Sequence, residues 1–283
     1  MTEITSIVKS IQDIMRKDAG VDGDAQRLGQ LGWILFFKIL CDQEKQLLIL
    51  NKNYKSVIPK NLHWDNWAKN KEGITGDELI EFINNNLFHN LKNLTINENK
   101  LSKVVKSIFK DSFNYMKSGV LLRQLINKLN LIDFNKLKDK NAFGHIYETI
   151  LRDLQSAGNA GEFYTPRAVT NFIINCLKPD LGQKILDPAT GTGGFLTGVI
   201  NYLRKNSVKT LEDEKILQNN IFGVEKKSLP HLLCSTNLLL HGFEDTSNVR
   251  HDNTLERPLI DYGSKDQVDI VATNPPFGGS EED

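Results

Sequence analysis

Four consecutive residues near the end of the sequence, Asn274-Pro275-Pro276-Phe277, have the chemistry to hold an aromatic amine. They follow a short apolar run, so they are predicted to lie where a buried strand ends. The two prolines stop the strand and restrict the backbone. The Asn274 side-chain oxygen and a rigid backbone carbonyl can then accept both hydrogens of the amine, and Phe277 can stack on its ring. An amine held in this way can attack an electrophilic methyl group without a metal ion or a strong general base.

A second candidate site is the glycine-rich segment from Asp187 to Leu196, which follows a predicted strand and precedes a predicted helix. Glycines let a ligand approach the backbone, and free amides at a helix start favour anionic or polar groups. Asp187 can accept a hydrogen bond from a ligand ammonium group. No lysine follows the glycines, which disfavours a phosphate-binding P-loop. Glu225, at the end of the next predicted strand, can accept from both hydroxyls of a ribose.

Composition limits the class of protein. The 283 residues suffice for two domains, and 40% hydrophobic with 25% charged residues is typical of a chain that folds around a core. Basic and acidic residues number 35 each, so strong unaided DNA binding is not expected. No apolar run suits a membrane span and no secretory signal is visible, so we expect a cytoplasmic protein. Cys41, Cys176 and Cys234 are widely spaced in apolar stretches, which predicts buried reduced thiols and no metal site.

The first half of the sequence has the apolar periodicity of helices. The segment up to about Leu50 is so apolar that its helix is predicted to be buried on most sides. Asp77 is predicted to cap a helix that contains Leu79 and Leu87. His63 to Trp67 is interpreted as a loop with buried tryptophans. Further helices are predicted at 4–15, 101–116, 120–131 and 143–154.

After the glycine-rich loop at 156–161, predicted strands and helices alternate. Thr165 is predicted to cap a helix whose first residue is Pro166. Such alternation is typical of a parallel sheet with helices on both faces. The sequence therefore predicts a helical domain at 1–155 and an α/β domain at 156–283. The strands are predicted at 184–186, 221–224 and 268–272, and the helices at 166–177, 194–205 and 229–240.

These features resemble the N6-adenine DNA methyltransferases, and more closely the modification (M) subunit of type I restriction–modification systems. The resemblance covers nearly the whole chain. It implies a helical N-terminal domain for partner or DNA contacts, followed by a doubly wound, mainly parallel Rossmann-like methyltransferase sheet, with S-adenosyl-L-methionine as cofactor. Beside the helical first half, it rests on Gly161 to Arg167, Asp187 to Leu196, Leu238 to Gly242 and Asn274 to Phe277.

The resemblance also implies roles for individual residues. Catalysis falls to Asn274, Pro275, Pro276 and Phe277. Asp252 or Asn253 would lie beside the cofactor adenine, and the register leaves both open. The other implied cofactor contacts are Glu162, Phe163, Tyr164, Thr165, Pro166 and Arg167 on the methionine side, Asp187, Ala189, Gly191, Thr192, Gly193 and Gly194 along the loop, and Glu225 at the ribose.

The resemblance implies a site-specific adenine DNA methyltransferase that reaches its base by flipping it out of the duplex. It implies a specificity (S) subunit that reads the DNA, a second M subunit and, for cleavage, a restriction (R) subunit. The sequence ends six residues after Phe277, where the family's catalytic domain continues. We therefore expect a sheet that is incomplete on its C-terminal side and an isolated chain without turnover. Two alternatives are a non-catalytic interaction or cofactor-binding fragment, and an amino-methyltransferase acting on cytosine N4 or protein glutamine.

Overall fold

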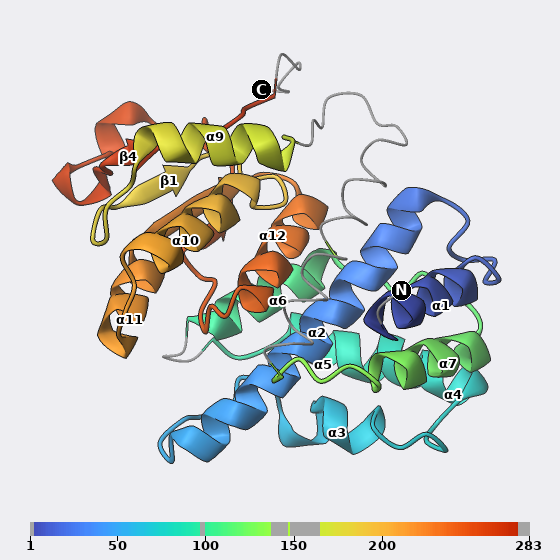
Figure 1. Cartoon of the computed structure of the whole chain (residues 1–283). Coiled ribbons are helices and arrows are strands. Elements are labelled where there is room, and N and C mark those ends of the chain that lie inside the picture. The colour runs from blue at the N-terminus through green and yellow to red at the C-terminus, as the bar shows by residue number, and fades with distance from the viewer. Residues whose placement is uncertain (1–2, 97–99, 137–146, 148–164, 277–283) are drawn as a thin grey trace. The chain divides into compact units, whose positions relative to one another are not determined.

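The chain forms two compact units, Met1–Leu154 and Gln155–Asp283. The structure, a computed structural model, describes residues 3–96, 100–136, 147 and 165–276 (Figure 1). The predicted glycine-rich loop at 156–161 lies outside the described residues, as does all of the predicted helix at 143–154 except Tyr147.

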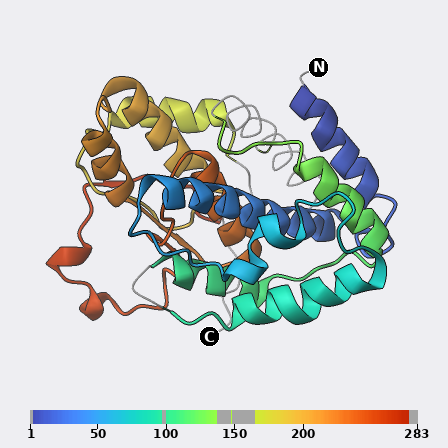
Figure 2. The same cartoon turned by 90° about the horizontal axis from the view of Figure 1, so that it is seen from below.

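The first unit is helical and is arranged around one long helix, α2. Figure 2 shows α2 running lengthwise through this unit, with shorter helices around it. Its helices are α1 (Glu3–Met15), α2 (Asp24–Leu50), α3 (Trp64–Trp67), α4 (Gly76–Glu81), α5 (Phe88–Lys92), α6 (Leu101–Asp111) and α7 (Gly119–Leu129), with a 3₁₀ turn η1 (Lys60–Leu62) and a π-helical stretch η2 (Phe82–Leu87).

The position of α2 follows from its composition, because a helix that is apolar on most sides must be surrounded to be buried. Its Trp33 ring packs edge-on against Phe88 at 5.0 Å, and its Phe37 ring packs against Phe109 at 5.8 Å. All four side chains are buried. The predicted burial of this helix is confirmed between Leu28 and Glu44, but it is wrong for the last turns, where Leu48, Ile49 and Leu50 are exposed. Within the part of the chain that the structure describes, no helix has both the length and the apolar character needed to span a bilayer.

Helix α6 ends at Asp111, five residues earlier than predicted. The chain then runs without helical structure, because side chains of the bundle accept its backbone hydrogen bonds. The Tyr115 N–H donates to Gln30 Oε1 at 2.8 Å, and the Ser118 N–H donates to Asp18 Oδ2 at 2.9 Å. These long-range acceptors replace helical carbonyls, so a tertiary contact overrides the local periodicity.

Two local predictions in this unit are wrong. The segment around Trp64 and Trp67 is the short helix α3 and not a loop, although both indoles are buried as expected. Trp64 Nε1 donates to Asn130 Oδ1 at 2.8 Å, which ties α3 to the end of α7. Asp77 lies inside the first turn of α4, and Thr75 occupies the N-cap position. An acidic residue in that turn still favours the helix through its dipole.

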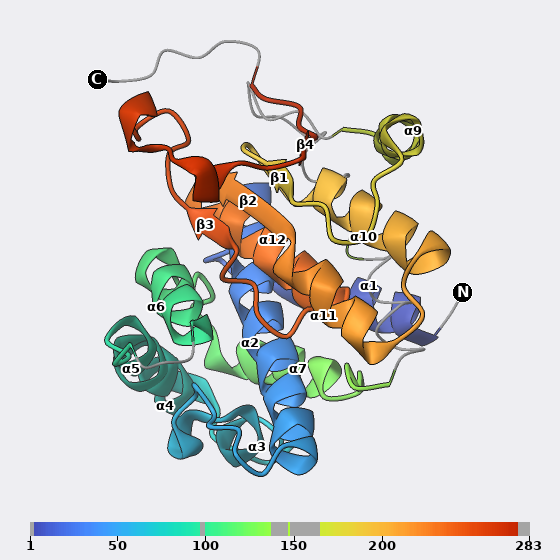
Figure 3. The same cartoon turned by 90° about the vertical axis from the view of Figure 1, so that its left-hand side faces the viewer.

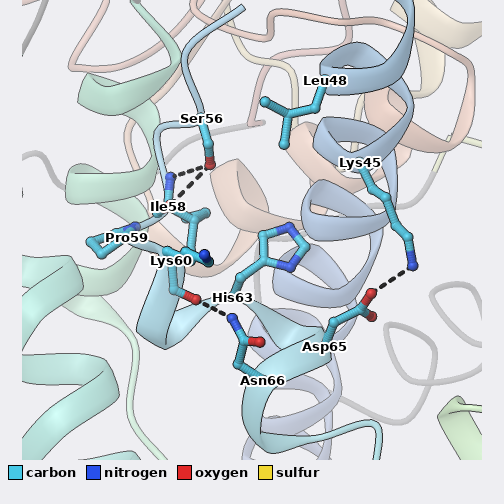
Figure 4. A pocket seen from close by; sticks show the side chains of 9 residues that line it. All are labelled: Lys45, Leu48, Ser56, Ile58, Pro59, Lys60, His63, Asp65 and Asn66. Atoms are coloured by element: carbon cyan, nitrogen blue, oxygen red, sulfur yellow. Dashed lines mark hydrogen bonds and ion pairs between the residues drawn. The ribbon is translucent and has the colours of Figure 1, made fainter.

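A cavity of about 550 Å³ opens between the end of α2 and the segment that leads to α3. Its wall is mainly apolar, with Leu48, Ile58 and Pro59, and Figure 4 shows His63 between the two sides. Lys45 and Asp65 form an ion pair at 2.5 Å on its rim. None of the residues to which the sequence assigned chemistry lines this cavity.

The second unit is built on a parallel sheet of four strands in the order β3-β2-β1-β4, seen side by side in Figure 3. The predicted parallel α/β fold is confirmed. Its elements are α9 (Arg167–Leu177), β1 (Ile185–Asp187), α10 (Gly194–Asn206), α11 (Leu211–Asn219), β2 (Ile221–Glu225), α12 (Ser228–Leu240), β3 (Val249–His251), two 3₁₀ turns η3 (Leu259–Asp261) and η4 (Ser264–Asp266), and β4 (Ile270–Val271).

The chain steps from β1 to β2 and on to β3 in one direction, through α10, α11 and α12. Right-handed crossovers in one direction place α10 and α12 on the same face of the sheet. Helix α9 packs beside α10, and Ile174, Ile185, Leu196 and Ala272 belong to the shared core. Between β3 and β4 only η3 and η4 are described, so the helices expected on the second face are not among the described elements.

The prediction of three buried thiols is wrong at one position. Cys41 and Cys234 are buried, but Cys176 is exposed on α9. Helix α9 turns Thr170 and Ile174 to the core and leaves Phe172 exposed, so an apolar sequence here does not mean a fully buried helix. No disulfide is formed by the three cysteines.

Candidate active site

Three polar side chains follow neighbouring strands of the sheet at the edge where the strands end. Asp187 is the last residue of β1, Glu225 is the last residue of β2, and Asn274 comes three residues after β4. Strand β1 pairs with β2 on one side and with β4 on the other, and the chain reverses its direction across the sheet at this point. Ligands of parallel α/β sheets bind outside the carboxyl ends of the strands at such a switch point.

The glycine-rich loop after β1 closes over the end of β2. The Thr190 N–H donates to the Val224 carbonyl at 3.1 Å, and the Gly193 N–H donates to the Thr190 carbonyl at 2.8 Å. Gly193 has a φ of +80°, and a Cβ there would lie 2.8 Å from Cys234 Sγ. Gly191 has a φ of +51°, but a Cβ there would meet no atom within 4 Å. The loop is therefore packed against α12 at Gly193 and has open space at Gly191.

The Glu225 carboxylate is directed into this loop and is buried. Its Oε2 accepts the Gly191 N–H at 2.8 Å, and its Oε1 accepts the Lys227 N–H at 2.9 Å. The two amides fix the carboxylate in one orientation before any ligand arrives.

Asp187 is almost fully buried, with 1% of its surface exposed. Burial raises the pKa of this carboxyl from 3.8 to about 6. The Ala189 N–H, which donates to Asp187 Oδ1 at 3.1 Å, acts in the opposite direction, and the nearby Glu225 charge adds to the increase. A buried carboxylate can gain much from a ligand that brings a positive charge.

The Asn274 side chain is half-buried and reaches the segment that precedes α9. Its Nδ2 donates to Thr165 Oγ1 at 3.0 Å. Thr165 does not cap α9 as predicted, because Pro166 occupies the N-cap position with an extended backbone. Pro275 and Pro276 are exposed.

Four predicted site residues lie outside the part of the chain that the structure describes. They are Glu162, Phe163, Tyr164 and Phe277.

Arg167, the first residue of α9, contacts the start of α10. Its Nη1 donates to the Gly194 carbonyl and to Thr197 Oγ1, each at 2.7 Å. Gly194 is the first residue of α10, so the guanidinium fixes the first turn after the glycine-rich loop. Arg167 therefore supports the geometry of the loop from behind.

The segment after β3 lies against the same loop. Thr254 Oγ1 donates to the Pro188 carbonyl at 2.5 Å, and the Asp252 N–H donates to the Glu225 carbonyl at 3.0 Å. The Asp252 carboxylate is exposed and accepts from Arg250 at 3.0 Å, whereas Asn253 Oδ1 accepts the Leu255 N–H at 3.1 Å. Both candidates for the adenine contact are thus on a segment that borders the loop.

Three residues that the sequence analysis missed shape this site. Asn237 is fully buried on α12 and donates from Nδ2 to the Thr192 carbonyl at 3.0 Å, which braces the loop. Gly223 in β2 leaves room for Thr190, since a Cβ there would lie 2.5 Å from Thr190 Cγ2. Cys234 packs under Gly193. A glycine inside a strand and a lone asparagine inside an apolar helix were the available signals.

The strand ends and the glycine-rich loop define a Rossmann-like α/β unit with a candidate ligand site at its switch point. The chain belongs to the N-6 DNA methylase family, whose model matches residues 138–283. A second model, the HsdM N-terminal domain, matches residues 4–129 in the helical unit. The family shares a reaction class, methyl transfer, that generally uses S-adenosylmethionine.

Relatives and solved structures agree with this assignment. The chain is 60% identical over 282 residues to the methylase subunit of the type I restriction enzyme EcoEI from Escherichia coli. Its fold matches a crystal structure of a modification subunit from Vibrio vulnificus YJ016 with a TM-score of 0.84 and 43% identity, over 99% of this chain. It also matches a chain from a structural study of type I restriction–modification complex assembly, with a TM-score of 0.86 and 32% identity, over the whole of this chain.

The chain is shorter than these proteins. The match covers 99% of this chain but 57% of the EcoEI subunit, and it covers 61% and 57% of the two solved chains. The similarity therefore spans both units of this chain and about three fifths of each relative.

Proposed function

We propose that this chain binds S-adenosyl-L-methionine and takes part in methyl transfer to the N6 amine of adenine in DNA, as the modification subunit of a type I restriction–modification complex. One observation carries the proposal. Asn274 follows β4, and β4 pairs directly with β1, whose end bears Asp187 and the glycine-rich loop. A methyl acceptor held at Asn274 would lie at the same sheet edge as a cofactor held by the loop.

The residues at this edge suit the cofactor. The open side of Gly191 gives a ligand access to the backbone, and the oriented Glu225 carboxylate suits the two ribose hydroxyls. Asp187 would accept the ammonium group of the methionine part, with Thr192, Gly193 and Gly194 along its backbone. Ala189 would lie beside Asp187, and Glu162 to Arg167 would border the methionine side. Asp252 or Asn253 would contact the adenine.

When bound, S-adenosyl-L-methionine supplies the electrophilic methyl group. Asn274 Oδ1 and the Pro275 carbonyl would accept the two hydrogens of the target amine, which directs the nitrogen lone pair toward the methyl group. Pro276 would keep the backbone rigid, and Phe277 would stack on the flipped base. After methyl transfer, the methylated amine would release a proton to water or to a neighbouring acceptor.

Because the chain carries no net charge, we expect other subunits to contribute to DNA binding. We propose that a specificity subunit reads the DNA sequence and that a second modification subunit completes the methylating complex. A restriction subunit would join for cleavage. The helical unit would make partner or DNA contacts, and the DNA substrate implies a cytoplasmic location.

The proposal is tested by methyl incorporation from labelled cofactor into DNA, with the protein assembled with its specificity subunit. We expect labelled N6-methyladenine, and Asn274→Ala should abolish it while cofactor binding persists. Equal methylation by Asn274→Ala would overturn the proposal. Parallel reactions with cytosine-methylation substrates and with protein test the alternative amines, and label on either in place of adenine would redirect the substrate assignment.

A further inference from the structure

The hydrogen bond from Asn274 Nδ2 to Thr165 Oγ1 joins two residues that are 109 positions apart in the sequence. Asn274 comes after the last described strand, and Thr165 comes before the first helix of the same unit. Both side chains are half-buried. The contact therefore links the segment proposed to border the cofactor with the residue proposed to hold the methyl acceptor.

Thr165 is held in a defined place. Pro166 restricts the residue before it to an extended backbone, which keeps Thr165 out of α9. Helix α9 is in turn fixed to α10 through the two hydrogen bonds from Arg167 and through the core residue Ile174. Thr170 Oγ1 donates to the Pro166 carbonyl at 3.2 Å and secures the start of the helix. The Thr165 hydroxyl is thus presented from a rigid element.

The direction of this hydrogen bond has a chemical consequence. A side-chain amide has its oxygen and its NH₂ group on opposite sides of one carbon. When Nδ2 of Asn274 donates to Thr165, Oδ1 faces away from Thr165 and is available as an acceptor. The reverse orientation would set the donor NH₂ against the donor NH₂ of an incoming amine, which cannot form a hydrogen bond.

We infer that Thr165 is a positioning residue for the Asn274 amide, and that it presents Oδ1 to the amine that is to be methylated. The inference rests on the proposed function and deepens it. It gives Thr165 a role toward the methyl acceptor, whereas the resemblance implied only a cofactor contact.

Thr165→Val, which keeps the shape and removes the hydroxyl, separates these roles. In the assembled enzyme we expect kcat to fall between about three- and tenfold, the effect of losing one hydrogen bond. Thr165→Ser should restore most of the rate. If the Thr165 hydroxyl serves Asn274 and not the cofactor, the Kd for S-adenosyl-L-methionine, measured by calorimetry, should change less than about twofold, because valine keeps the shape of the side chain at the methionine side.

Thr170→Val is the matched control, since it perturbs the start of α9 without touching Asn274. An equal loss of kcat in Thr170→Val would overturn the inference, because α9 stability would explain both. A normal kcat in Thr165→Val would also overturn the inference. A normal kcat together with weaker cofactor binding would show that Thr165 serves the cofactor.

A spectroscopic measurement tests the contact independently of turnover. In protein labelled with ¹⁵N-asparagine, the Asn274 side-chain NH₂ signals should shift in Thr165→Val and return toward their original positions in Thr165→Ser. Signals that do not move would overturn the contact. If they move while adenine methylation proves independent of Asn274, the proposed function fails and the positioning contact is retained.

Discussion

Glu225 Oε2 accepts the backbone N–H of Gly191 at 2.8 Å, across 34 residues of sequence. The carboxylate at the end of β2 and the loop after β1 are therefore parts of one hydrogen-bonded unit. The second oxygen, Oε1, accepts the Lys227 N–H, so the carboxylate joins the loop after β1 to the turn that follows β2. A residue proposed to bind a ribose is thus also one that shapes the loop.

Glu225→Gln should weaken both the loop and the cofactor site. Glutamine keeps one acceptor oxygen but sets an NH₂ group against one of the two backbone amides. We expect the free energy of unfolding of the second unit to fall by about 1–3 kcal/mol. The Kd for S-adenosyl-L-methionine should rise at least about tenfold. Chemical denaturation and calorimetry measure these quantities. Glu256→Gln, at an exposed position, serves as control. If Glu225→Gln lowered the free energy of unfolding no more than Glu256→Gln does, Glu225 would have no role in the loop.

The two glycines with positive φ in the loop should tolerate alanine differently. Both variants incur about 1–2 kcal/mol for a left-handed backbone with a side chain. Gly193→Ala should cost at least about 1 kcal/mol more than Gly191→Ala, since its Cβ would lie 2.8 Å from Cys234 Sγ, whereas that of Gly191 meets open space. Denaturation curves compare them. Adding Cys234→Ala should recover part of the loss only for Gly193→Ala. Equal costs without this recovery would refute the packing argument.

Asp187 should lower stability as the pH rises. Burial raises its pKa from 3.8 to about 6, so below pH 3.8 the carboxyl is protonated in both states and has no effect. Between pH 3.8 and about 6 the unfolded chain releases the proton first, and the free energy of unfolding falls. The full loss, about 3 kcal/mol, is reached above that window.

The isosteric Asp187→Asn removes this titration. Its free energy of unfolding, relative to the original protein, should therefore rise by about 2.4 kcal/mol between pH 4 and pH 7. Asp261→Asn, at an exposed position in η3, controls for general charge effects. A pH-independent difference for Asp187→Asn would contradict the elevated pKa.

Cofactor binding should follow the same group in the opposite sense. If Asp187 accepts the ligand ammonium group, the ionised carboxylate is the form that binds. The affinity for S-adenosyl-L-methionine should then fall about tenfold for each pH unit below the pKa of about 6. Calorimetry at several pH values measures the profile. Asp187→Asn should bind more weakly and lose the pH dependence, and a variant that keeps the profile would assign it to another group.

Arg167→Met should destabilise the second unit. It leaves in place the backbone groups of the loop that are proposed to contact the cofactor. The guanidinium supplies two hydrogen bonds of 2.7 Å to the first turn of α10. Its loss should lower the free energy of unfolding by about 1–3 kcal/mol. The exposed Arg250→Met, which breaks only the ion pair with Asp252, should cost less than about 1 kcal/mol. Equal effects would show that Arg167 does not support the loop.

The sequence correctly predicts the strands, the turn and the helix start around the candidate site, because these elements depend on neighbours in the chain. One continuous segment contains the short apolar run of β1, the two glycines with positive φ and the start of α10. Glu225 likewise directly follows the apolar Val224 at the end of β2. The parallel order of strands follows from the alternation with helices. These patterns are encoded within about ten residues, so periodicity and turn chemistry reveal them.

The tertiary structure decides what periodicity cannot. Thr165 looks like a helix cap, yet its hydroxyl accepts from Asn274, because β4 and the start of α9 meet at one sheet edge. The helix that ends at Asp111 would continue by its sequence, but Asp18 and Gln30 offer better acceptors from another part of the bundle. The sequence by itself determined the chemical groups and the strands that bear them. Which of these groups contact one another depends on how segments distant in the sequence pack together, and that is a property of the whole unit.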